Sequence, residues 1–165
     1  MTVRRFVPWP DARLKTVCAP IAAVDDEIRD IWNDMVDIME AMPGLGLAAP
    51  QIGVTRRLAV VDCSRERGQV VRLANPEVIH ASATLRAHEE ASPNLPGVTA
   101  RVERPRAVKV RFLDEAGALV ERDFVGLWAT SVQHQIDHLN GRMYFDNLSK
   151  TRRDMLLRKA RKANR

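Results

Sequence analysis

The sequence lacks the features that define several specialised classes of protein. It has two cysteines in 165 residues, Cys18 and Cys63, which form no CxxC pair, so we expect buried or inert thiols and no disulfide framework. No stretch approaches the roughly 18 to 20 consecutive apolar residues of a membrane helix. Pro8 and Asp11 interrupt the segment after the basic N-terminus, where a secretory signal would be apolar. These absences predict a cytoplasmic protein with no membrane partner.

Internal repeats and low-complexity linkers are also missing, which favours a single domain over residues 1–165. Positive charge is concentrated at one end of the chain. Residues 150–165 hold eight basic side chains and one acidic one, a net charge of +7, so the remainder carries −2 of the total +5. The basicity therefore belongs to this terminal segment and not to the rest of the fold.

Apolar periodicity predicts three helices. Apolar residues at spacings of three and four begin after Asp25 and stop before Pro43. A second helix is predicted over residues 126–139, and a third, basic helix over residues 150–165, beginning near Ser149. Asp11 is expected to cap a shorter turn near the N-terminus.

β-branched residues bounded by turn residues predict several strands between the first two helices. The predicted strands are residues 57–62, 70–74, 107–113 and 119–124, and a hairpin loop at 114–117 joins the last two. A helix followed by strands and then by further helices indicates an α+β fold.

His134 and His138 lie four residues apart in the second predicted helix. At that spacing both rings project from one face and can bind a single metal ion. The usual hydrolase motif has a glutamate directly after the first histidine, where it takes a proton from metal-bound water. This chain has Gln135, whose neutral amide cannot accept and return a proton. From the motif alone, a metal site and a pair of helical histidines without metal both remain open.

Two longer motifs resemble those of the peptide deformylase family. Residues 44–53, GLGLAAPQIG, match the family's GxGxAAxQ signature, and residues 133–141, QHQIDHLNG, are similar to its QHExDHLxG with one change. Shorter matches follow in the family's order over nearly the whole chain, at residues 10–14, 75–76, 97–98, 126–127 and after Ser149. The resemblance implies antiparallel sheets around a central helix that carries HxxxH, and a basic C-terminal helix.

The family's middle motif, EGCLSxP, corresponds to residues 90–96, EASPNLP. By this resemblance a divalent metal, Fe²⁺ in the family with Zn²⁺ or Ni²⁺ as alternatives, is held by two histidines and a cysteine thiolate. His134 and His138 match, but Ser92 stands at the cysteine position. A hydroxyl is far less acidic than a thiol and a poorer metal ligand. We therefore expect weak or absent metal binding, with Glu89, Glu90 and Asn94 as other sources of a ligand oxygen.

Two further positions concern the reaction itself. In the family, the backbone N–H after that cysteine and the glutamine of GxGxAAxQ stabilise the oxyanion. Gln51 is present, but Pro93 has no N–H. Gln135 stands at the position of the catalytic glutamate. Loss of a general base typically costs about 10² to 10⁴ in rate, and loss of one oxyanion donor about 10² to 10³. Ordinary deformylase activity is therefore not expected.

The resemblance also implies a retained groove for an extended peptide. Its substrate-binding positions are Gly44, Leu45, Gly46, Glu90, Leu127 and Thr130, of which Leu45, Leu127 and Thr130 would line the pocket for the first side chain. The two glycines can also serve a turn after the first helix, so their role remains open.

Two hypotheses of function follow. In the first, this deformylase-like hydrolase has lost or strongly reduced its ability to remove the N-formyl group from N-formylmethionyl peptides of nascent proteins, and its cleft binds N-terminal peptides. In the second, it is an active metallo-amidase or deformylase with an altered metal site or a different substrate. Cys-to-Ser and Glu-to-Gln changes are also standard inactivating substitutions, but Ala91 and Pro93 beside them favour natural divergence.

The basic segment 150–165 has two compatible interpretations. It can be a solvated amphipathic helix docked on the domain by its apolar stripe. It can also contact ribosomal RNA phosphates, since the family's terminal helix is associated with docking on the ribosome.

Overall fold

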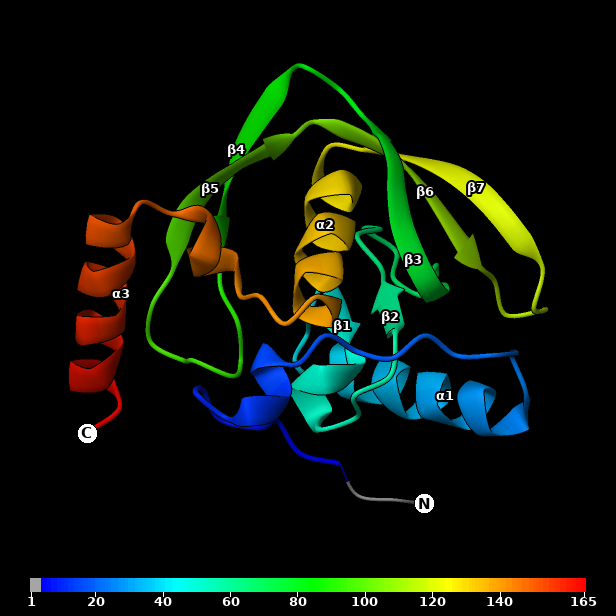
Figure 1. Cartoon of the computed structure of the whole chain (residues 1–165), viewed down its shortest axis with the longest axis horizontal. Coiled ribbons are helices and arrows are strands. Elements are labelled where there is room, and N and C mark those ends of the chain that lie inside the picture. Colours follow the sequence, from blue (N-terminus) through cyan, green and yellow to red (C-terminus); the bar gives the residue numbers. More distant parts are fainter. Residues whose placement is uncertain (1–3) are drawn as a thin grey trace.

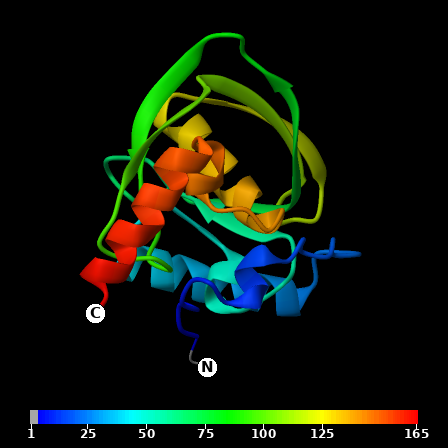
Figure 2. The same ribbon diagram turned by 60° about the vertical axis from the view of Figure 1, so that its left-hand side comes forward.

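Two antiparallel sheets curve around helix α2 (Leu127–Leu139) in the computed structural model, which describes residues 4–165 (Figures 1 and 2). The five-stranded sheet has the order β1-β2-β3-β6-β7, and its strands are β1 (Gly46–Ala48), β2 (Leu58–Val61), β3 (Val71–Ala81), β6 (Ala107–Leu113) and β7 (Leu119–Val125). The second sheet pairs β4 (Leu85–Glu90) with β5 (Ala100–Pro105). Helix α2 therefore lies between the two sheets, where both can position residues around it.

The other helices lie outside these sheets. Helix α1 (Asp26–Ala41) packs against β1 and β2, and helix α3 (Lys150–Ala163) lies beside the β4–β5 sheet (Figure 1). Both have side-chain caps, because Asp25 accepts a hydrogen bond from the N–H of Ile28 and Ser149 accepts one from the N–H of Arg152. Three short 3₁₀ helices complete the chain: Ala12–Lys15, Ala49–Ile52 and Tyr144–Asn147.

Apolar side chains form three clusters that hold α2, α1 and α3 in place. The first joins α2 to the five-stranded sheet through Ala129, Val132, Ile136, Val110, Phe112 and Phe124. The second places α1 on β1 and β2 through Ile28, Trp32, Met35, Met39, Leu47 and Leu58. The third lies under α3 and includes Val102, Tyr144, Phe145, Leu156 and Ala160. Because full burial of one such large side chain contributes roughly 1.5–3 kcal/mol, these clusters hold the three helices against the rest of the fold.

The α+β fold predicted from the sequence, with antiparallel sheets around the central helix, is confirmed, and so are the three helices. One strand was predicted to end at Ala74, whereas β3 continues to Ala81. Asn75 has a φ of 51°, and the pairing of β3 with β6 shifts register between Ala74 and Glu77. Asn75 and Pro76 therefore form a bulge inside β3, at the place where the sequence predicts the strand to end.

The β4–β5 hairpin was not predicted, because its inward side chains are mostly polar. Arg86, His88 and Glu90 alternate along β4 toward α2, and buried Arg104 follows buried Val102 on β5. Alternation of apolar with polar residues, on which strand prediction depends, is absent there. Over residues 4–165, no helix combines the length and apolar character needed to cross a membrane.

Candidate functional site

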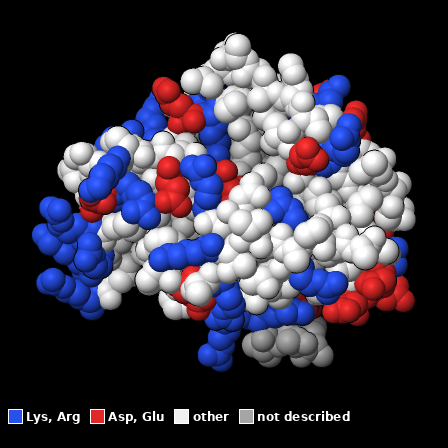
Figure 3. All heavy atoms as spheres, in the orientation of Figure 1, with Lys and Arg blue, Asp and Glu red and all other residues white. Residues whose placement is uncertain are grey.

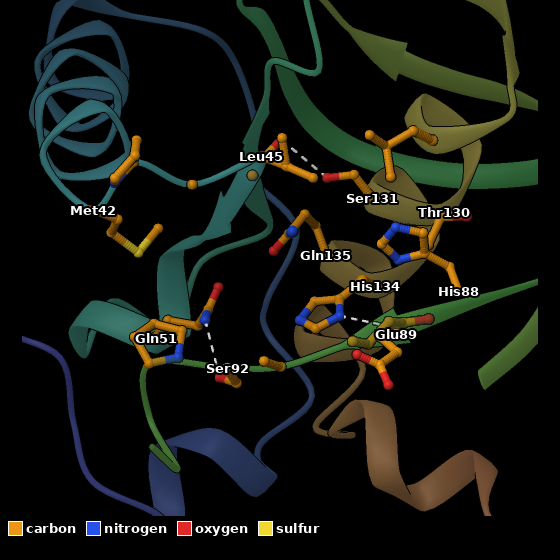
Figure 4. Close-up of a pocket in the computed structure, with 17 residues that line it drawn as sticks. Met42, Leu45, Gln51, His88, Glu89, Ser92, Thr130, Ser131, His134 and Gln135 are labelled. Carbon is orange, nitrogen blue, oxygen red and sulfur yellow. Dashed lines mark hydrogen bonds and ion pairs between the residues drawn. The ribbon is translucent and has the colours of Figure 1, made fainter. Parts of the chain in front are cut away.

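A cleft of about 440 Å³ lies between β1, the end of β4 and helix α2 (Figure 4). Its lining includes eleven of the twelve site residues predicted from the sequence: Gly44, Leu45, Gly46, Gln51, Glu90, Ser92, Pro93, Leu127, Thr130, His134 and Gln135. In the described chain, β1 pairs only with β2 and β4 only with β5, so both are edge strands of their sheets. The cleft is therefore walled by two strand edges and floored by one helix.

The two histidines of α2 lie together below the cleft. Their Nε2 atoms are 3.2 Å apart and their ring centroids 4.9 Å apart. His134 lines the cleft, whereas His138, the twelfth predicted residue, lies behind it and is 1% exposed. Burial, together with the nearby His134 and Arg104, holds the pKa of His138 well below its usual value, so this ring is neutral. Its Nδ1 has no hydrogen-bond partner among residues 4–165.

Glu90 orients the His134 ring and is itself held by Arg104. His134 Nδ1 is 2.8 Å from a Glu90 oxygen, and Arg104 donates to both oxygens of Glu90 at 2.7 and 2.9 Å. Burial alone would raise the pKa of Glu90, but hydrogen bonds from His134 and Arg104 outweigh it and the pKa is lowered. Because an ionised Glu90 can only accept, Nδ1 of His134 carries a proton and donates it, which turns Nε2 toward His138.

Arg104 and Tyr144 complete the surroundings of His134, and neither was predicted from the sequence. Arg104 also donates to Asp137 at 2.9 Å, so it bridges two carboxylates from β4 and α2. Tyr144 stacks on the His134 ring, with centroids 5.9 Å apart and an interplanar angle of 15°. Burial, with a contribution from Glu90, raises the pKa of Tyr144 to about 12, so the phenol is neutral. The sequence offered no signal for Arg104, because residues 100–105 were not predicted as a strand.

Ser92 is engaged by neighbouring amides. Its hydroxyl donates to Oδ1 of Asn94 at 3.0 Å, and Nε2 of Gln51 lies 3.4 Å from the same hydroxyl oxygen. Gln51 also donates to Asn94 Oδ1 at 2.9 Å and accepts from the N–H of Ala48 at 2.9 Å. Asn94 Oδ1 thus accepts two hydrogen bonds in a residue that is 2% exposed. It is therefore unavailable as the oxygen ligand suggested from the sequence.

Gln135 is buried against β1 without a hydrogen-bond partner for its Oε1 atom among the described residues. Gly46 makes room for it, because an added Cβ there would lie 2.5 Å from Gln135 Nε2 and 2.6 Å from Ser131 Oγ. A side chain at position 46 would therefore displace the buried ends of Gln135 and Ser131. The close approach of strand to helix explains this glycine without a turn.

These donors do not fit the metal that the resemblance implies. The cleft offers two imidazoles and a serine hydroxyl that is already hydrogen-bonded, whereas Glu90 is engaged by Arg104 and His134. Within residues 4–165, no group of three or more His, Cys, Asp or Glu side chains is arranged to hold a metal ion. An anionic ligand comparable to a thiolate is missing from this set. The weak metal binding predicted from the sequence stays a prediction.

Comparisons with known proteins agree over almost the whole chain. A family model described as polypeptide deformylase matches residues 3–154. The chain is 40% identical to a peptide deformylase of Rhizorhabdus wittichii, covering 100% of this chain and 97% of that protein, and 41% identical to one of Phenylobacterium zucineum, covering 98% and 97%. A crystal structure of a peptide deformylase from Legionella pneumophila matches with a TM-score of 0.90 and 36% identity over 99% of this chain and 96% of that one. One from Ehrlichia chaffeensis in complex with actinonin matches with a TM-score of 0.91 and 33% identity over 100% and 99%.

Proposed function

This chain belongs to the polypeptide deformylase family, and from that premise we propose that it binds N-terminal peptides in its cleft but hydrolyses N-formyl groups slowly or not at all. The observation that carries the proposal is the hydrogen bonding of Ser92. This neutral hydroxyl is held by Asn94 and Gln51 at the position to which the resemblance assigns a metal-binding thiolate. A group in this state supplies no negative charge to a metal.

The other groups that would act on the reacting atoms support the same conclusion. Gln135 cannot carry a proton between water and a leaving amine, because an amide neither accepts nor returns one at neutral pH. Pro93 offers no N–H to a developing oxyanion. The Nε2 atom of Gln51, the remaining donor, is already hydrogen-bonded to Asn94 at 2.9 Å. Proton transfer therefore lacks a base, and the oxyanion keeps at most Gln51 as a donor.

Peptide binding is supported by the two walls of the cleft. An extended peptide can add to a free strand edge through main-chain hydrogen bonds, and side-chain pockets then set specificity. Residues 43–46 before and within β1 form one wall, and residues 88–91 at the end of β4 form the other. The volume of about 440 Å³ lies within the range of small-ligand sites, roughly 300–1,000 Å³.

A second candidate, an active metallo-amidase with an altered site, is favoured by one distance. Two nitrogen ligands of a tetrahedral metal with bonds of about 2.0–2.1 Å are separated by about 3.3–3.4 Å. The Nε2 atoms of His134 and His138 are 3.2 Å apart. The carboxylate on His134 Nδ1 is also the partner that metal-binding histidines commonly have. This candidate requires ligands beyond the two histidines.

We also propose that α3 contacts RNA phosphates. The packing of Leu156 and Ala160 into the third apolar cluster leaves the basic residues outward. Lys and Arg gather over this helix (Figure 3); its exposed basic side chains are Lys150, Arg152, Arg158, Lys159, Arg161 and Lys162. A one-sided array of this kind suits a phosphate backbone. The docked apolar stripe expected from the sequence is present and leaves this role open.

The peptide-binding protein and the active metallo-amidase are distinguished by measuring peptide binding, turnover and metal content in one preparation. We expect a formyl-Met-Ala-Ser peptide to bind, as followed by calorimetry, while the formyl group stays intact and tightly bound metal is substoichiometric. Near-stoichiometric Fe, Zn or Ni after dialysis against a mild chelator, with turnover of an amide, would establish the altered enzyme instead. Failure of any N-terminal peptide to bind would reject the binding function.

A further inference from the structure

One end of the cleft carries positive charge that the protein itself does not neutralise. Arg86, His88 and Glu90 alternate along β4 and share the face that is turned to α2. Glu90 is paired with Arg104 and His134. Within residues 4–165, no carboxylate oxygen lies within 4 Å of the Arg86 guanidinium, and the His88 ring has no hydrogen-bond partner. Two basic side chains on this face are thus without an acid of their own.

Arg86 is also held beside a like charge. It stands directly opposite Arg104 in the β4–β5 pairing, so the two guanidinium groups share one face of the hairpin. Like charges directly opposite one another in a sheet are destabilising. Arg104 is compensated by the carboxylates of Glu90 and Asp137, whereas among the described residues the only side-chain hydrogen bond of the Arg86 guanidinium is to the hydroxyl of Thr130, at 3.2 Å. An anion arriving near Arg86 would relieve this repulsion.

Thr130 connects this charge to the cleft. Its Oγ1 accepts the hydrogen bond from Arg86, so its own proton is left to donate to another acceptor. Thr130, His88 and the apolar Leu45 line the cleft (Figure 4), and Leu127 adds a second apolar side chain to its lining. Glu89 also lines it, but lies on the exposed face of β4. This end of the cleft therefore combines apolar walls with the polar groups of Thr130 and His88, and Arg86 is hydrogen-bonded to Thr130.

From this arrangement we infer that the pocket for the first side chain takes a residue ending in a carboxylate, with glutamate the best fit, and not an apolar methionine. The methylene groups of glutamate suit Leu45 and Leu127, and its carboxylate suits Thr130, His88 and the charge of Arg86. This inference rests on the proposed peptide-binding function and adds the class of N-terminal residue to it. Arg86 acts as a specificity-determining residue.

The test is a set of three formyl-X-Ala-Ser peptides with a C-terminal fluorophore, in which X is Glu, Gln or Met. Binding is measured by fluorescence anisotropy at low and moderate salt. We expect the Glu peptide to bind at least about 10-fold more tightly than the Met peptide at low salt, with Gln between them. The preference should shrink as salt is added, since it is electrostatic.

Variants assign the preference to its residues. Arg86→Met should abolish the advantage of Glu over Met while leaving binding of the Met peptide, which also reports that the cleft is folded. His88→Leu should reduce the advantage. Arg122→Met, exposed on β7, removes the same charge outside the cleft and should leave the preference unchanged.

Three results would overturn the inference. Tighter binding of Met than of Glu by the unmutated protein rejects it and leaves the proposed binding function standing. An undiminished preference for Glu in Arg86→Met rejects Arg86 as its source. If none of the three peptides binds, the proposed function itself fails, and the inference fails with it.

Discussion

The two sides of the His134 ring differ in how their polar groups are used. Behind the ring, the supporting network of Glu90, Arg104 and Asp137 forms hydrogen bonds of 2.7–2.9 Å between opposite charges. On the cleft side, Ser92, Pro93 and Gln135, called the reactive face for the role proposed above, are neutral, and Gln135 Oε1 has no partner in the described chain. The groups that orient the ring are therefore charged, whereas those beside it in the cleft are neutral.

This difference separates positioning from chemistry. A buried ion pair is maintained only if its partners stay matched, because loss of one leaves an uncompensated charge in the interior. The supporting network is therefore constrained by folding itself, whatever the protein does. Ser92, Pro93 and Gln135 carry no charge, so a change among neutral residues at these positions leaves no buried charge without its partner.

The largest effect is expected when the reactive face is restored. The triple variant Ser92→Cys, Pro93→Leu and Gln135→Glu should gain about 10⁴-fold or more in deformylation of a formyl-Met peptide, because base and oxyanion donor alone account for that range. Each single variant should gain little, since groups that act as a unit are strongly non-additive. A folded, metal-loaded triple variant without activity would mean that the cleft has diverged beyond these atoms.

The supporting network should respond in stability. Arg104→Met leaves the Glu90 carboxylate buried with a single partner and is expected to lower the free energy of unfolding by about 3–5 kcal/mol. Urea denaturation measures this change. Arg111→Met, which breaks the exposed pair with Glu121, is the matched control and should cost less than about 1 kcal/mol. Equal losses in the two variants would show that the network is not the constrained region.

Helix α3 belongs to neither the supporting network nor the reactive face, so its RNA binding should change independently of both. If it binds RNA through about four phosphates, affinity should fall roughly 10²-fold between 50 and 200 mM salt. Charge reversal of Arg158, Lys159 and Lys162 should weaken binding without loss of fold. Truncation is unsuitable, because Leu156 and Ala160 are buried in the third cluster. Salt-independent binding, or binding unaffected by the reversal, would identify α3 as only a solvated face.

The smallest effect is expected at Tyr144, which stacks on His134 but forms no hydrogen bond with the supporting network. Its hydroxyl is buried without a partner among residues 4–165. Tyr144→Phe keeps the ring stacked on His134 and removes an unsatisfied polar group, so we expect stability to be unchanged or to rise by about 1 kcal/mol. A loss above about 1 kcal/mol in urea denaturation would mean that this hydroxyl belongs to the network after all.

Much of the fold was predictable, because helices α1, α2 and α3 have clear apolar periodicity and sequence caps such as Asp25 and Ser149. The β4–β5 hairpin was not, since its inward residues serve the site and break the apolar pattern. The cleft positions were predictable because they lie within contiguous motifs. Arg104 and Asn94 were harder to predict, because their roles depend on contacts with Glu90 and Gln51 that only the folded chain brings about.

The central claim is that this cleft binds but hardly hydrolyses, and one rate tests it directly. The unmutated protein and the peptide deformylase of Rhizorhabdus wittichii, prepared with the same added metal, would be compared on one formyl-Met peptide. We expect kcat/KM of this protein to be lower by a factor of about 10⁴ or more. A value within tenfold of the relative would contradict the account, because the reactive face would then be competent as it stands.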